Sequence, residues 1–153
     1  MSSSATLKLG DTGVAFVSTF WLGLLIGVSF LATPVKFQAD TLTLPVALEV
    51  GRVTFALFSK MEWGLYILLL MAAILSRSSL FRWGYLLVLL ALQLTESLWL
   101  LPVLDARVGD VMAGRTIPDS SHHFLFIATE LCKAVLLFAI SVSGFRSRAV
   151  APN

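Results

Sequence analysis

The chain has 153 residues, of which 58% are hydrophobic and only 13% are charged. A mean hydropathy of +0.89 is too high for a soluble globular protein of this length, so we expect an integral membrane protein with the lipid bilayer as its surroundings. The formal net charge of +2 comes from basic residues near the ends of apolar segments. It supplies no basic surface of the kind that binds nucleic acid, and a nucleic-acid partner is therefore excluded.

Four apolar segments have the length of about 20 residues that a helix needs to cross the hydrocarbon core of a bilayer. The first is expected at residues 13–33, where Pro34 is expected to end it. This segment is too long for a secretory signal and is followed by further apolar segments, so it is a retained membrane helix. Gly23 and Gly27 form a small-xxx-small pair, which favours the close approach of a neighbouring helix.

Three further helices follow. Residues 34–50 mix polar and apolar side chains and predict an interfacial loop that leads into the second helix. Pro102 is expected to break the third helix. Because the connections are short, successive helices are expected to be antiparallel neighbours. The sequence predicts one all-α domain over residues 1–153, an integral membrane four-helix antiparallel bundle with its remaining helices at residues 51–76, 81–101 and 123–144.

The distribution of basic residues predicts the orientation. An even number of spans puts both termini on one side of the membrane, together with the connection between the second and third helices. That side carries the basic residues Lys8, Arg77, Arg82, Arg146 and Arg148. The opposite loops carry Lys36, Arg52, Arg107 and Arg115. The positive-inside rule then predicts cytoplasmic N and C termini, in a bacterial inner membrane.

Five ionisable side chains lie inside the predicted spans and are the first candidates for function. Each opposes insertion by roughly 2.5–3.5 kcal/mol at the centre of a helix, so they are expected to face the interior of the bundle and to pair. Such residues usually mark binding sites or translocation paths in membrane proteins. They are Lys60, Glu62, Glu96, Glu130 and Lys133.

Most of these residues are predicted to converge. Counted from the end opposite the termini at 1.5 Å per residue, the three glutamates and Lys133 fall at depths of about 12–16 Å. Helical phase puts His123, Glu130 and Lys133 on one face of the last helix, and Gln93 and Glu96 on one face of the third. Trp21 is expected to pack beside them. The predicted ligand- or ion-binding residues are Glu62, Gln93, Glu96, His123, Glu130 and Lys133.

Two interpretations of this group are open. One is a structural ion-pair network, Glu62 or Glu130 with Lys133, that holds the bundle together. The other is a functional polar pocket that opens at the end opposite the termini and has His123 at its mouth. Three carboxylates against two lysines leave one excess negative charge, which requires a proton on a carboxylate or a bound cation. The leading hypothesis is a small membrane protein that binds or transfers a small cation or a proton.

A metal ion is the only cofactor that the sequence suggests. Histidine together with carboxylates from several helices is a donor set of metal sites in helical bundles. A membrane metalloenzyme is therefore an alternative, with Glu62, Glu96, His123 and Glu130 as the candidate metal ligands. No nucleophile with a base partner and no phosphate-binding loop occurs, so no hydrolase or kinase is indicated and enzymatic activity stays open. Cys132 is the single cysteine and is interpreted as a small buried apolar residue.

Lys60 suggests a different class of function. It points away from Glu62 by roughly 160° around the second helix, so it need not join the group. A homo-oligomer or a larger membrane complex would supply an acidic partner for it. The second alternative is therefore an accessory or structural subunit of a membrane complex that docks through Lys60.

Several short motifs occur in the first half of the chain. They are Phe20-Trp21-Leu22-Gly23, the segment from Ala32 to Phe37 with Pro34 inside it, and Gly51-Arg52 followed by Phe55 and Phe58. On these residues the chain resembles the transmembrane protein 205-like family of small four-helix membrane proteins. The resemblance implies the four-helix architecture, and it does not extend to the three intramembrane glutamates.

Overall fold

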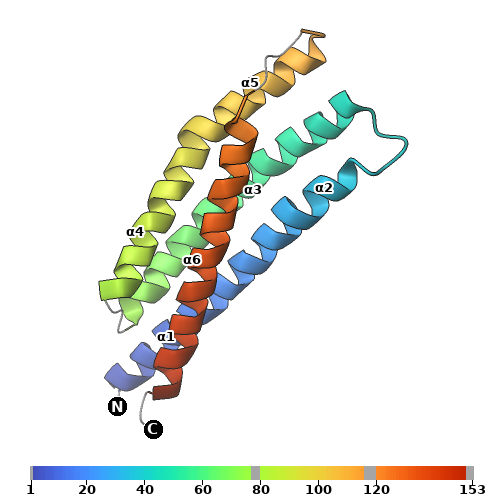
Figure 1. Ribbon diagram of the computed structural model, residues 1–153. Coiled ribbons are helices and arrows are strands. Elements are labelled where there is room, and N and C mark those ends of the chain that lie inside the picture. Colours follow the sequence, from blue (N-terminus) through green and yellow to red (C-terminus); the bar gives the residue numbers. More distant parts are fainter. Residues whose placement is uncertain (1, 77–79, 116–119, 151–153) are drawn as a thin grey trace.

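The computed structural model describes residues 2–76, 80–115 and 120–150. Within these ranges, four helices are long and apolar enough to cross a membrane, and they pack together as a bundle (Figure 1). This confirms the predicted all-α four-helix fold. The start of the first helix and the end of the last lie at one end of the bundle, called the termini end below; the other is the far end (Figure 1).

The first helix consists of three consecutive elements, in which η denotes a π-helical stretch. They are α1 (Ser2–Leu25), η1 (Ile26–Ala32) and α2 (Thr33–Lys36). The second helix is α3 (Leu44–Leu75). The third consists of α4 (Leu80–Thr95), η2 (Glu96–Leu100) and α5 (Leu101–Met112), and the fourth is α6 (His122–Val150).

Neither Pro34 nor Pro102 ends its helix, which corrects the expected helix ends at residues 33 and 101. A proline lacks the N–H donor, and its ring crowds the carbonyl four residues earlier. In both places a π-helical stretch lies just before the proline. The N–H of Thr33 and that of Leu101 each bond to the carbonyl five residues back, instead of four. This wider turn accommodates the proline, so each helix continues beyond it.

The helices are also longer than expected at other ends. The polar start of the chain is helical from Ser2, and the last helix continues to Val150. The expected lead segment before the second helix is part of α3, which starts at Leu44. Pro45 does not interrupt it because proline is tolerated in the first turn, where its missing N–H would have no partner within the helix.

Each helix buries one stripe of residues spaced three or four apart, the pattern of a helix with one face toward a core. On α1 the buried stripe is Asp11, Val14, Ser18, Trp21 and Leu25. On the third helix it is Arg82, Leu86, Leu89, Gln93, Glu96 and Leu100. Polar groups therefore lie in the same interior stripes as the apolar core.

Two glycines mark the closest helix contacts, both near the termini end. A Cβ atom on Gly144 would lie 2.8 Å from the backbone nitrogen of Ala15, and one on Gly10 would lie 2.4 Å from that of Ser76. The predicted close approach at Gly23 and Gly27 is wrong, because a Cβ atom on either would meet no atom of another described helix within 4 Å. The helices pack most tightly far from that pair.

Candidate functional site

The centre of the bundle holds a cluster of four buried charged side chains, called the Lys133 cluster below. Lys133 Nζ lies 2.7 Å from Glu62 Oε1 and 2.6 Å from Glu130 Oε1, and it also donates a hydrogen bond to Glu96 Oε2. These side chains are between 0% and 2% exposed. The structure thus brings together the four predicted residues from α3, the third helix and α6.

Polar side chains surround this cluster. Gln93 Nε2 lies 3.3 Å from Glu62 Oε2, and Gln93 Oε1 lies 3.5 Å from Lys133 Nζ. The indole N–H of Trp21 donates to Glu62 Oε1 over 3.0 Å, so the first helix also contributes. The hydroxyl of Ser29 donates to Glu130 Oε2. Ser29 was not predicted, because the sequence analysis considered ionisable side chains and a serine in a membrane helix gives no comparable signal.

Both π-helical stretches carry residues of this site. Ser29 lies in η1, and Glu96 is the first residue of η2. π-helical turns are rare and occur frequently at functional sites. Glu96 lies at the middle of its 33-residue helix, Leu80–Met112. It is therefore deeper in the bundle, measured from the far end, than predicted. The reason is that this helix continues past Pro102.

The cluster has an excess of negative charge. Three carboxylates share one ammonium group, so two negative charges are not neutralised within the cluster. Two oxygens, Glu96 Oε1 and Glu130 Oε1, are buried and accept no hydrogen bond from any residue that the structure describes, and of these Glu130 Oε1 lies 2.6 Å from Lys133 Nζ. A buried carboxylate oxygen without a donor is costly, and its cost falls when the group carries a proton or meets a cation.

The three glutamates are the residues that a metal ion could use. One carboxylate oxygen from each lies within 4.8 Å of the others, and all three side chains are buried. However, Lys133 Nζ already lies among these oxygens. A metal ion about 4 Å from that ammonium would be opposed by about 4 kcal/mol for each unit of its charge at an effective dielectric constant of 20. The donor set therefore fits a metal ion poorly while the lysine stays in place.

The structure does not bring His123 to the cluster. Its side chain is exposed, and its ring packs edge-on against Phe124 at 6.4 Å between centroids. His122 packs against Trp99 and hydrogen-bonds to Ser120. Seven residues separate His123 from Glu130, which is about 10 Å along a helix, so a shared face did not imply a shared depth.

Two other predicted residues lie on the outside of the bundle. Lys60 is exposed, as its helical phase predicted, and makes no ion pair with the residues that the structure describes. Cys132 is also exposed, which corrects its interpretation as a buried residue. It lies next to buried Lys133, and adjacent residues of a helix point in directions about 100° apart.

A second buried charge group lies near the termini end and was missed from sequence. Arg82 Nη1 lies 3.0 Å from Asp11 Oδ1, and the guanidinium also donates to the hydroxyls of Ser76, Ser143 and Ser147. Arg82 is 2% exposed. Its partners lie on α1, at the end of α3 and on α6, so this side chain of α4 links all four helices. It was predicted as a basic residue flanking the membrane because it lies two residues into its helix.

An apolar layer separates the Arg82 group from the Lys133 cluster. It consists of the buried residues Val14, Leu69, Leu86, Leu89, Leu137 and Ile140. Along the third helix, Gln93 lies 11 residues beyond Arg82, which is about 16 Å. Ser18 and Tyr66 are buried in the same region, so the charged cluster is closed off from the termini end by packed side chains, most of them aliphatic.

Comparisons with protein-family models, with curated proteins and with solved structures give no match. The resemblance to the transmembrane protein 205-like family therefore stays a prediction. The function has to be argued from the Lys133 cluster itself.

Proposed function

We propose that the protein binds protons at the Lys133 cluster and exchanges them with the far end of the bundle. The observation that carries the proposal is the position of Lys133 Nζ among the carboxylates of Glu62, Glu96 and Glu130. One ammonium neutralises one of three buried carboxylates. In a site with almost no contact with water, the other two charges call for bound protons or a cation.

A proton is favoured over a larger cation for a steric and an electrostatic reason. The place among the carboxylates is occupied by the lysine, whereas a proton needs no additional space. The buried oxygen Glu96 Oε1, which accepts no hydrogen bond from the described residues, is the first candidate to carry one. A metalloenzyme that uses His123 is not favoured, because that side chain is exposed.

A purely structural role accounts less well for the composition of the cluster. A buried pair needs one acid for each base, and even a matched pair is often no more stabilising than apolar residues of the same size. Two additional buried acids increase the desolvation cost. Their presence, next to two π-helical stretches, supports a site that changes its protonation state in use.

Apolar side chains cover the cluster on both sides, with Phe58, Leu100 and Phe126 buried toward the far end. The hydroxyl of Ser29 lies on that side and donates to Glu130 Oε2, so exchange is proposed to run past Ser29 to the far end. In an inner membrane with cytoplasmic termini, which is our prediction, that end faces outward. Transfer across the membrane would require the apolar layer to open.

Labelling with dicyclohexylcarbodiimide tests the proposal. This apolar reagent enters membranes and reacts with a protonated carboxyl group, but not with a carboxylate. We expect peptide mass spectrometry to find the label on Glu96 or Glu130, with less label as the pH rises. Glu49 is the internal control, because its carboxylate pairs with Arg52 at 2.5 Å and should stay unlabelled. Absence of label from the whole cluster would overturn the proposal.

A further inference from the structure

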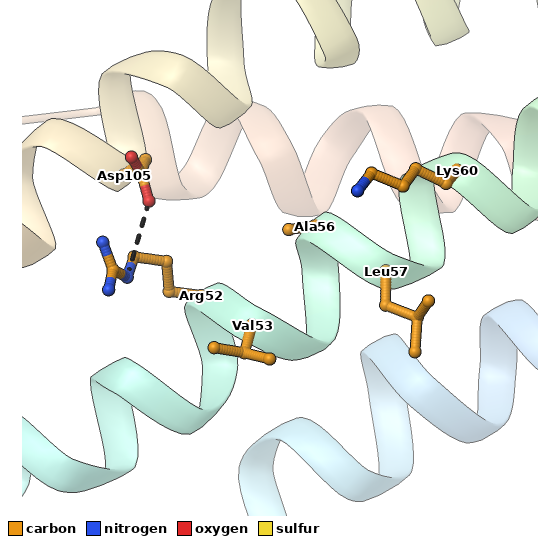
Figure 2. Close-up of a pocket in the computed structure, with 6 residues that line it drawn as sticks. All are labelled: Arg52, Val53, Ala56, Leu57, Lys60 and Asp105. Atoms are coloured by element: carbon orange, nitrogen blue, oxygen red, sulfur yellow. Dashed lines mark ion pairs between the residues drawn. The ribbon is translucent and has the colours of Figure 1, made fainter.

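A pocket of about 470 Å³ lies on the outer surface of α3, where this helix faces the start of α5. Figure 2 shows its six lining residues, of which all but Asp105 belong to α3: Arg52, Val53, Ala56, Leu57, Lys60 and Asp105. Arg52, Ala56 and Lys60 are spaced four residues apart, so they share one face of the helix. Because the side chain of Ala56 is short, a hollow remains between Arg52 and Lys60.

The two basic residues of this pocket differ in their partners. Arg52 lies 2.5 Å from Glu49 and 3.6 Å from Asp105, the ion pair drawn as a dashed line in Figure 2. Lys60 has no ion pair or hydrogen bond with the described residues. The pocket therefore presents one ammonium group without a counter-charge.

The position of Lys60 argues against water as the partner of its ammonium group. It lies eight residues further into the span than Arg52, which is about 12 Å along the helix. Its neighbours Val53 and Leu57 are each 60% exposed, so they form part of the apolar outer surface. Figure 2 shows the Lys60 side chain extended along α3 toward Arg52, the direction that brings its ammonium closer to the membrane surface.

We infer that this pocket binds the phosphate group of an anionic phospholipid. The phosphate accepts hydrogen bonds from Lys60, and Val53 and Leu57 contact the acyl chains. Charge complementarity supports a phosphate, since it is the anion that a bilayer supplies at its surface, toward which the Lys60 side chain extends, and a strong acceptor for an ammonium group. The volume is that of a site for a small molecule.

Native mass spectrometry of the full chain in detergent micelles tests this inference. The probes are phosphatidylglycerol, the zwitterionic phosphatidylcholine with the same acyl chains, and inorganic phosphate. We expect phosphatidylglycerol to bind in preference to phosphatidylcholine. The variant Lys60→Met keeps an unbranched apolar side chain and should bind phosphatidylglycerol at least about tenfold more weakly, since it loses a charge-assisted hydrogen bond.

The control variant is Lys8→Met, which removes the same charge at the termini end and should bind phosphatidylglycerol like the wild type. Equal binding of both lipids, or unchanged binding by Lys60→Met, would overturn the inference. Inorganic phosphate that displaces the lipid would point to a soluble anion and would also overturn it. So would an oligomer that depends on Lys60 and forms equally without lipid, because the occupant would then be protein.

Discussion

Lys133 Nζ and Glu62 Oε1 lie 2.7 Å apart in the middle of the bundle, although 71 residues separate them in the chain. The same Glu62 oxygen accepts the indole N–H of Trp21 from the first helix. This carboxylate therefore links α1, α3 and α6 within a site whose charged side chains are at most 2% exposed. Substitutions that change the charge of this site are therefore expected to lower the free energy of unfolding.

Replacing Lys133 by methionine should destabilise the protein by about 3–5 kcal/mol, because it leaves three buried carboxylates without their cation. Denaturant titration in detergent micelles measures the free energy of unfolding. Lys8→Met is the control, since Lys8 lies at the termini end, outside the cluster, and its substitution should change this free energy by less than about 0.5 kcal/mol. Equal stability of Lys133→Met and the wild type would mean that the ammonium does not hold the cluster.

Neutralising Glu62 should cost more than neutralising Glu96. Both oxygens of Glu62 face donors, so the amide group of Glu62→Gln would point its own N–H groups at one of them and cost about 1–3 kcal/mol. In Glu96→Gln the amide nitrogen can take the place of Oε1, which accepts no hydrogen bond from the described residues. The same titration compares the two variants, and the reverse order would contradict the hydrogen-bond pattern.

The Arg82–Asp11 pair should show strong coupling in a double-mutant cycle. Arg82→Met leaves a buried carboxylate and Asp11→Asn leaves a buried guanidinium, so each should cost about 3–5 kcal/mol. The double variant leaves no unpaired charge and should cost less than the sum of the two. Additive effects in the cycle would show that the two side chains act independently.

Gly144→Ala should destabilise the bundle because the new Cβ atom would lie 2.8 Å from the backbone of Ala15, and the two helices would have to separate. Gly84→Ala is the matched control. Its Cβ atom would meet no described atom within 4 Å, and alanine favours a helix over glycine by about 0.8–1.0 kcal/mol. The midpoint temperature of thermal unfolding should be highest for Gly84→Ala, intermediate for the wild type and lowest for Gly144→Ala. A Gly144→Ala variant as stable as the wild type would contradict the close packing.

Hydrophobic length predicted the four helices, and helical phase predicted the convergence of Glu62, Gln93, Glu96, Glu130 and Lys133. Both succeeded because these polar side chains face the interior of a small bundle, whereas Lys60, which also lies within a span, is on the outside. The helix ends were wrong because π-helical turns before Pro34 and Pro102 let the helices continue. Phase alone also failed for His123, which shares a face with Glu130 but lies two turns away.

The Arg82 group was missed for a different reason. A basic residue near the start of a membrane helix is usually interfacial, and only the structure shows that Asp11 lies beside it. Its burial also removes one basic residue from the count that predicted cytoplasmic termini. The orientation therefore stays a prediction.

Infrared spectroscopy of the protein in lipid at neutral pH tests the central claim most directly, because a protonated carboxyl group and a carboxylate absorb in separate regions. We predict a protonated-carboxyl band in the wild type that weakens in Glu96→Gln and persists in Glu49→Gln. A spectrum in which the wild type has carboxylate bands alone would contradict proton binding at the Lys133 cluster.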